Sequence, residues 1–285
     1  MTAGAPGADA PVGIFDSGVG GLSVLRSIRA LLPEEDLVYL GDTARVPYGS
    51  KSPETVRTYC LNITEHLLAL GCKAVVIACN TASAFAHGAV EAFAGVPVVD
   101  VIRPVAADVA RSGHRRVLVL GTRGTVSSGA YVEALHQHDA GVVVAQQACP
   151  LFVPLAEEGW LSGDVPRLVT ETYLREPLAT HTPEALILGC THYPVLRASI
   201  EQVLQSYATG PVSVYDSGPA TAKQLRGELE RAGLRRERST AGAVRYLVTD
   251  TPETFSPLAS RFLGEPVARA EHVDITRGPR IGRSG

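Results

Sequence analysis

AVVIACNTAS, residues 74–83, is the stretch that decides the fold. Its first five residues are apolar and show no polar alternation, which predicts a parallel strand covered on both faces. Asn80 and Thr81 follow, and both are residue types that open helices. Cys79 lies between the two elements, and this stretch alone leaves two interpretations open. The residue is either a small buried filler at a strand end or a reactive thiol with a helix starting behind it.

Strand-like runs alternate with segments of helical periodicity along most of the chain. Residues 12–15 and 36–43 have the composition of strands, and the first run leads into a glycine-rich turn. Apolar residues recur at helical spacing in other segments, as in residues 53–71, where Gly71 ends the pattern. This alternation predicts an α/β fold with mainly parallel sheets.

The strand pattern occurs twice. The runs at Val12 and Leu37 both recur 105 residues later, at Val117 and Val142, and Cys79 recurs 111 residues later as a second cysteine. Two equal offsets and a slightly longer one indicate a duplicated βαβαβ unit with a small insertion. We therefore predict two similar Rossmann-like or flavodoxin-like α/β lobes. The elements that follow the second unit could extend either lobe.

Bulk composition excludes several classes of function. The chain has 285 residues, a formal net charge of -3 and a pI near 6.2, so no overall basic field exists that would gather nucleic acid. No apolar run reaches the roughly 18 residues that a membrane span requires. The start of the chain lacks the basic and apolar regions of a secretion signal. We expect a cytoplasmic protein with neither a membrane nor an obligate nucleic-acid partner.

Cysteine and lysine usage narrows the chemistry. Five cysteines, none in a CxxC pair, are scattered over the chain, which favours a reducing compartment over a disulfide framework. Cys60, Cys72 and Cys149 are predicted to be structural. Only three lysines occur, so a Schiff-base mechanism has few candidates. Because a GxxxxGKS/T loop and an HExxH motif are also absent, a common type of nucleotide or metal enzyme is not indicated.

The two recurring cysteines, Cys79 and Cys190, end equivalent strands. Ligands of open parallel sheets bind outside the carboxyl ends of the strands, so both thiols are expected to flank one cleft between the lobes. The N–H groups of a first helical turn can lower the pKa of such a thiol. His192 could serve as a base or an ion-pair partner for Cys190, and Asp16 is expected at the same sheet edge as Cys79.

Ordinary structural interpretations stay open for these residues. His192 could be a surface histidine, and Asp16 could make a turn or cap before Gly18. A zinc site of Cys79, Cys190 and His192 is conceivable, but the close ligand pairs of such sites are absent. Two thiols across one pocket instead favour inversion of a stereocentre, because one group removes a proton from one face and the other returns a proton to the opposite face.

Five motifs in a fixed order carry a family resemblance. They are GIFDSGVGGLSV, YLGDTARVPYG, ACNTAS, CPLFVPLAEEG and LGCTHYP, all within residues 13–194, and YDSG follows them in the closing segment. With these motifs the sequence resembles glutamate racemases, members of the cofactor-independent aspartate/glutamate racemase superfamily. One motif alone would be weak evidence, whereas five in the expected order are highly specific.

The resemblance implies two α/β lobes related by a pseudo-twofold axis, with the active site in the cleft between them. The expected bounds are 11–103 with 213–275 for the first lobe, 104–212 for the second, and 1–10 and 277–285 for tails whose composition predicts disorder.

Residue roles also follow from the resemblance. Cys79 and Cys190 are the expected acid and base, with Asp16 assisting Cys79 and His192 assisting Cys190. Family substrate contacts correspond to Asp16, Ser17, Tyr48, Gly49, Asn80, Thr81, Thr191 and His192.

Further expectations concern the reaction and its setting. Glu157 is expected as an auxiliary acid near Cys190, with the adjacent Glu158 as the alternative in this register. Cys190 would take the α-proton of L-glutamate and Cys79 that of D-glutamate, which supplies peptidoglycan synthesis. The resemblance implies no pyridoxal phosphate and no metal, and it implies a homodimer.

Two rival functions come from the same residues. An aspartate racemase, or another amino-acid racemase of the superfamily, is the nearer one, although aspartate racemases resemble this pattern with a carboxylate at the His192 position. A two-lobe amino-acid-binding protein without catalysis is the other. It has no need of cysteines at equivalent strand ends, so the pair Cys79 and Cys190 argues against it.

Overall fold

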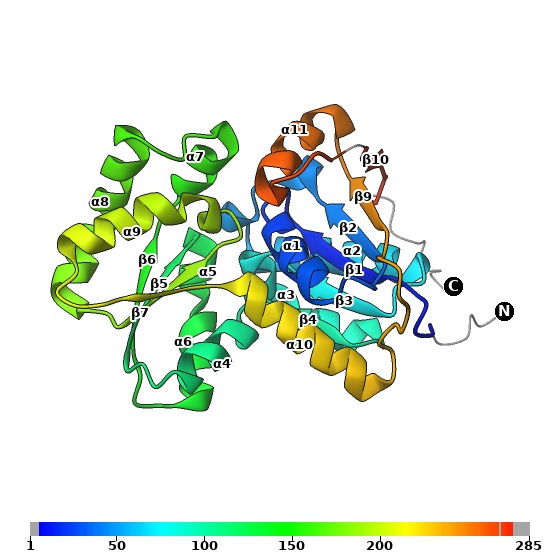
Figure 1. The fold of residues 1–285 in the computed structure, drawn as a ribbon, viewed down its shortest axis with the longest axis horizontal. Coiled ribbons are helices and arrows are strands. Elements are labelled where there is room, and N and C mark those ends of the chain that lie inside the picture. Colours follow the sequence, from blue (N-terminus) through cyan, green and yellow to red (C-terminus); the bar gives the residue numbers. More distant parts are fainter. Residues whose placement is uncertain (1–5, 268, 276–285) are drawn as a thin grey trace, which may run out of the picture.

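The protein consists of two α/β lobes side by side (Figure 1), described by a computed structural model over residues 6–267 and 269–275. Its strands are β1 (Val12–Asp16), β2 (Leu37–Gly41), β3 (Ala74–Ile77), β4 (Val98–Asp100), β5 (Arg116–Gly121), β6 (Val143–Ala148), β7 (Ala185–Gly189), β8 (Ser213–Asp216), β9 (Val244–Val248) and β10 (Glu271–His272).

Helices connect these strands. The α-helices are α1 (Leu22–Leu31), α2 (Pro53–Ala69), α3 (Asn80–Ala94), α4 (Arg103–Arg111), α5 (Arg123–Ser128), α6 (Ala130–His138), α7 (Phe152–Glu158), α8 (Asp164–His181), α9 (Arg197–Tyr207), α10 (Ser217–Ala232) and α11 (Pro252–Leu263). Short 3-10 helices are η1 (Thr43–Arg45), η2 (Tyr48–Ser50) and η3 (Tyr193–Leu196).

Two parallel sheets organise the lobes. The six-stranded sheet has the order β10-β9-β2-β1-β3-β4, and the four-stranded sheet has the order β6-β5-β7-β8. In the six-stranded sheet, α1, α10 and α11 pack on one face and α2 and α3 on the other. In the four-stranded sheet, α7, α8 and α9 cover one face and α4 and α6 the other. Burial on both faces explains the unbroken apolar run of β3, and the predicted α/β fold is confirmed.

The duplicated unit is visible in the strand registers. β1 lies between β2 and β3, and β5 lies in the same way between β6 and β7. Val12 pairs with Leu37 in β2, whereas its counterpart Val117 pairs with Val144 in β6. The counterpart of Leu37 is therefore Val144 rather than Val142, which corrects the offset predicted for the second strand. The sequence alone could not distinguish the two positions, because residues 142–144 are all valine.

The boundary between the lobes differs from the expected one at β8. The second lobe was expected to end at residue 212, yet β8 pairs with β7 in the four-stranded sheet. The chain then enters α10 directly, and the carboxylate of Asp216 caps this helix by accepting a hydrogen bond from the N–H of Gly218 at 3.1 Å. Residues 213–216 therefore lie with the second lobe, and α10 is the segment that returns the chain to the first.

The ends of the chain are described only in part. Of the tails predicted to be disordered, residues 1–5 and 277–285 lie outside the described residues. Residues 6–10 have defined contacts, since the ammonium of Lys73 donates to the carbonyl of Ala8 at 2.5 Å. Within the described residues, no helix combines the length and apolar character needed to cross a membrane.

Candidate active site

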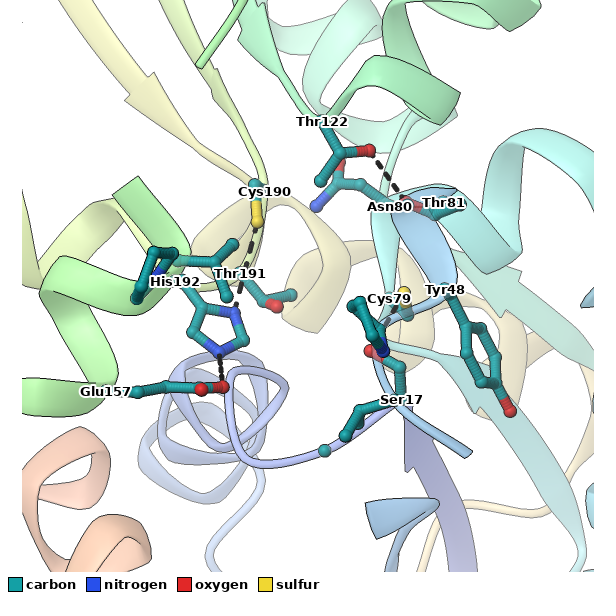
Figure 2. Close-up of a pocket in the computed structure, with 16 residues that line it drawn as sticks. Ser17, Tyr48, Cys79, Asn80, Thr81, Thr122, Glu157, Cys190, Thr191 and His192 are labelled. Carbon is teal, nitrogen blue, oxygen red and sulfur yellow. Dashed lines mark hydrogen bonds and ion pairs between the residues drawn. The ribbon is translucent and has the colours of Figure 1, made fainter. Parts of the chain in front are cut away.

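A cavity of about 270 Å³ lies between the lobes at the carboxyl ends of their strands. This is just below the roughly 300–1,000 Å³ of typical small-molecule sites, which suits a ligand of amino-acid size. Ten of the eleven predicted site residues line it, namely Ser17, Tyr48, Gly49, Cys79, Asn80, Thr81, Glu157, Cys190, Thr191 and His192. The eleventh, Asp16, lies fully buried behind the wall. The two sulfurs are on different sides of the cavity (Figure 2).

Cys79 lies in the turn that follows β3, and it is the N-cap residue of α3. Its thiol donates to the hydroxyl of Ser17 at 3.7 Å, and only 6% of the residue is exposed. Burial raises the pKa of Cys79 to about 12, and the charge of Asp16 acts in the same direction. The N–H of Ala82 in the first turn of α3 acts in the lowering direction, as expected, but burial outweighs it. The free thiol form is therefore favoured here.

Cys190 lies after β7 with a different set of neighbours. Its sulfur lies 4.0 Å from Nδ1 of His192, whose Nε2 lies 2.9 Å from a carboxylate oxygen of Glu157 (Figure 2). Burial by itself would lower the pKa of His192, but the partners Cys190 and Glu157 raise it to about 10. The imidazole is then protonated at neutral pH, so a positive charge lies beside the sulfur of Cys190.

The choice between Glu157 and Glu158 follows from α7. Glu157 lines the cavity and contacts His192, whereas Glu158 is exposed and does not line the cavity. The short helix begins at Phe152 and ends before Gly159, whose φ of 78° terminates it in the left-handed region. One residue of shift on a helix turns a side chain by about 100°, which separates these two neighbours.

Asp16 lies behind the cavity wall and contacts residues of both lobes. Its carboxylate accepts hydrogen bonds from the N–H of Gly18 at 2.9 Å and from the hydroxyl of Thr191 in the other lobe at 3.4 Å. Burial raises the pKa of Asp16, while the nearby His192 acts to lower it. Asp16 thus makes the predicted turn contact with Gly18, and its charge also acts on Cys79 and on His192.

The loop that carries Tyr48 and Gly49 is held by a buried carboxylate. Asp42 accepts hydrogen bonds from the hydroxyl of Tyr48, from Nε of Arg45 at 2.7 Å and from the hydroxyl of Thr249 at 2.9 Å. Since the Tyr48 hydroxyl is engaged away from the cavity, this loop offers its backbone there. A Cβ on Gly49 would lie 2.9 Å from Cβ of a threonine in the other lobe, so the loop needs glycine for this close approach.

Thr122 lines the cavity and was not among the predicted residues. Its hydroxyl accepts from the N–H of Thr125 at 3.1 Å, which caps α5, and lies 2.9 Å from the hydroxyl of Thr81 in the first lobe. The other lining residues without a prediction are Gly18, Val46, Pro47, Val153 and Pro154. One signal could have found Thr122, because the 105-residue offset places it on Ser17.

Metal ligands do not gather at this site. Over residues 6–267 and 269–275, no three side chains of His, Cys, Asp or Glu are grouped in a way that could hold a metal ion. His192 lies beside Cys190 through one ring nitrogen, and its other ring nitrogen contacts the carboxylate of Glu157.

Fold and site together define a two-lobe α/β enzyme with one thiol from each lobe facing a shared cavity. A sequence model of the Asp/Glu/hydantoin racemase family matches residues 17–225. The glutamate racemase of Geobacter metallireducens is 47% identical over 267 residues, which cover 93% of this chain and 96% of the relative. The chain belongs to the Asp/Glu/hydantoin racemase family.

Solved structures agree with this assignment. Glutamate racemase from Francisella tularensis in complex with D-glutamate superposes with a TM-score of 0.87 at 35% identity, covering 94% of this chain and 99% of the other. Glutamate racemase from Thermus thermophilus in complex with beta-chloro-D-alanine gives 0.83 at 44% identity, covering 94% and 98%. The predicted resemblance to glutamate racemases is confirmed.

Proposed function

We propose that this protein is a glutamate racemase that interconverts L-glutamate and D-glutamate with two cysteines as the proton carriers. The observation that carries the proposal is the placement of Cys79 and Cys190 on different sides of one cavity (Figure 2). A substrate between them would present opposite faces of its α-carbon to the two sulfurs. Removal of the α-proton on one face and return of a proton on the other inverts the stereocentre.

The groups beside each thiol support one direction of proton transfer for each. Imidazolium at His192 supports a thiolate at Cys190, and burial keeps Cys79 protonated. The Cys190 thiolate takes the α-proton of L-glutamate and becomes a thiol, leaving the electron pair on the α-carbon. Cys79 then gives its proton to the opposite face, which yields D-glutamate and a Cys79 thiolate. The reverse reaction starts from that second protonation state.

The α-carbanion needs stabilisation, because an amino-acid α-proton is a very weak acid. The cavity supplies fixed donors rather than bulk water, from the side chains of Asn80, Thr81 and Thr191 and from backbone groups of the Tyr48–Gly49 loop. Donors held in place before the reaction stabilise developing charge without reorganisation. We further propose that the D-glutamate produced supplies peptidoglycan synthesis.

A homodimer is the assembly we propose. Four large apolar side chains between residues 151 and 168, on α8 and in the loops before and after α7, are about half exposed, namely Leu151 at 52%, Trp160 at 56%, Val165 at 47% and Leu168 at 51%. Large apolar side chains that lie together on a surface mark contact sites, and these four are close in sequence. Sedimentation velocity tests the proposal: wild-type protein should sediment as a dimer, and a monomer at micromolar concentration would contradict it. Leu168→Glu should shift a dimer toward monomer.

Proton exchange in deuterated water tests the function directly. The purified protein is incubated with L-glutamate without added cofactor, and α-deuterium incorporation and optical rotation are followed together. We expect D-glutamate that carries deuterium at the α-carbon, because the proton returned comes from a solvent-exchanged thiol. A parallel incubation with L-aspartate should show little exchange. Absence of exchange with glutamate, or full turnover by Cys79→Ser/Cys190→Ser, would overturn the proposal.

A further inference from the structure

Tyr131 is a fully buried side chain that links the two lobes behind the active site. It belongs to α6 of the second lobe, and its hydroxyl donates to Oδ1 of Asn80 in the first lobe at 2.7 Å. Asn80 is the first residue of α3 and follows Cys79 directly. The bond therefore connects the second lobe to the turn that carries the first thiol.

The Tyr131 bond fixes which way the Asn80 amide points. An amide has an acceptor oxygen and a donor nitrogen, and its orientation is set by the partners of each. Burial raises the pKa of Tyr131, so the phenol keeps its proton and donates it. With Oδ1 engaged, Nδ2 must point the other way, toward the cavity that Asn80 lines.

Nδ2 of Asn80 is an unused buried donor. The residue is 2% exposed, and among the described residues Nδ2 has no hydrogen-bond partner. Figure 2 shows this nitrogen directed toward the side of the cavity that holds Cys190. Buried polar groups are nearly always paired, so an unpaired donor facing a cavity indicates a ligand that brings an acceptor. A carboxylate is an acceptor that an amino-acid substrate supplies.

The ring of Tyr131 also contacts the other thiol turn. A Cβ on Gly189 would lie 2.9 Å from Cε2 of the ring and 2.6 Å from the carbonyl oxygen of Leu120, so this position admits only glycine without a shift. Gly189 directly precedes Cys190. One side chain thus touches the residue before Cys190 and the residue after Cys79.

We propose that Tyr131 is a positioning residue for the racemase, which orients the Asn80 amide so that its N–H group binds the carboxylate of the substrate. The inference rests on the proposed function, since it assigns the ligand of the same cavity. Tyr131 belongs to the second lobe and Asn80 to the first. The Asn80 amide is therefore oriented for substrate only when the two lobes are close enough for the Tyr131 hydroxyl to reach it.

Tyr131→Phe isolates the hydroxyl, because it keeps the ring against Gly189. A lost hydrogen bond of about 1 kcal/mol corresponds to roughly a fivefold change. We expect KM for L-glutamate and for D-glutamate to rise about fivefold, and kcat to change less than twofold, because the bond acts on ground state and transition state alike. Tyr173→Phe is the matched control: this hydroxyl accepts the N–H of Leu151 in the same lobe, and KM should not change.

A double-mutant cycle separates positioning from a general structural role. Asn80→Ala should raise KM by itself, and adding Tyr131→Phe to it should change KM less than twofold, because the group that Tyr131 orients is gone. If the two effects multiply instead, Tyr131 acts by another route and the proposal is wrong. A wild-type KM for Tyr131→Phe, with normal thermal unfolding, would equally contradict it.

Asn80→Asp tests the same donor without touching Tyr131, in case the tyrosine variant does not fold. An aspartate still accepts the Tyr131 hydroxyl but has no N–H group to offer, so KM should rise at least as much as in Asn80→Ala. An unchanged KM would refute the role of Nδ2. Failure of the proposed function is distinguishable, because wild-type protein would then show no α-deuterium exchange with glutamate at all.

Discussion

The turns after β3 and β7 occupy equivalent places in the two lobes, and each carries a cysteine that is 6% exposed. Their surroundings differ in charge. Cys79 has a neutral hydroxyl from Ser17 and the carboxyl of Asp16 nearby, and burial raises its pKa. Cys190 has a protonated imidazole that is itself held by Glu157. Equivalent backbone positions therefore carry thiols with different electrostatic surroundings.

This difference indicates that the duplicated fold places one thiol on each side of the substrate cavity. The side chains beside each thiol then decide which of the two holds a proton at the start of the reaction. A racemase needs one acid and one base at the start of each half-reaction. The backbone after β7 enters the 3-10 helix η3 instead of a long α-helix, and this places His192 beside Cys190. The turn after β3 enters α3 at once, so a helix terminus and not a cation faces Cys79.

The largest effect is expected from replacing either thiol. A serine hydroxyl is far less acidic than a thiol, so Cys79→Ser and Cys190→Ser should each lower racemisation about 1,000-fold or more. The comparison predicts opposite residual activities. In deuterated water, Cys79→Ser should still exchange the α-proton of L-glutamate through Cys190, and Cys190→Ser should exchange only that of D-glutamate. Proton NMR of each enantiomer measures both rates.

Control cysteines make the thiol result interpretable. Cys149 is buried in the second lobe and Cys60 in the first, and neither lines the cavity. Cys149→Ala and Cys60→Ala should keep wild-type turnover once folding is verified. Exchange of the same enantiomer by both serine variants would contradict the assignment of one thiol to each face.

Loss of the cation beside Cys190 should have the next largest effect. His192→Asn keeps a polar side chain but removes the charge that favours the thiolate, and we expect kcat/KM to fall about 100-fold. Enantiomers have equal free energies, so kcat/KM must fall equally in both directions. Steady-state kinetics from L-glutamate and from D-glutamate check this equality. A decrease of less than threefold would mean that Cys190 does not depend on His192.

A smaller effect is expected in the pH dependence of kcat/KM, which reports on His192 and Glu157. The pKa of His192 is about 10, so kcat/KM should hold through neutral pH and fall as the pH rises past about 10. Glu157→Gln removes one partner that raises this pKa, so the alkaline decrease should move to lower pH. An unchanged pH profile in Glu157→Gln would show that this carboxylate does not act through His192.

The contribution of His192 to the stability of the folded protein should decrease as the pH rises. A histidine whose folded pKa lies above its unfolded value of about 6.5 contributes stability that is complete below that value. This contribution is lost as the pH rises through the folded value of about 10. The wild-type protein should therefore be more stable than Glu157→Gln near pH 6, and the difference should shrink toward pH 10. Urea unfolding at a series of pH values measures it.

The sequence predicted the fold and the thiol pair because both depend on local patterns. The apolar run before Cys79, its repeat before Cys190 and the helix-opening Asn80 are all visible in a few consecutive residues. The raised pKa of Cys79 could not be predicted in this way, because the argument from a helix terminus omits the cost of burying a charge.

Other features depend on contacts between distant segments. β8 joins the four-stranded sheet by pairing with β7, and nothing in its own four residues distinguishes the two lobes. The two-residue strand β10 is too short to show a period. In the sequence, Tyr131 is one more apolar residue of a helical segment. Its contact with Asn80 exists only because the fold brings the two lobes together.

The smallest predicted effects compare Ser17 with Thr122, the residues that follow β1 and β5. The Ser17 hydroxyl lies 3.7 Å from the sulfur of Cys79 and acts to lower its pKa, so Ser17→Ala should reduce kcat for D-glutamate about fivefold with little change in stability. Thr122 caps α5, so Thr122→Ala should cost about 1 kcal/mol of unfolding free energy and change kcat less than twofold. Kinetics and urea unfolding of both variants test the pair. The opposite pattern would mean that the hydroxyl of the second lobe, rather than that of the first, supports proton transfer.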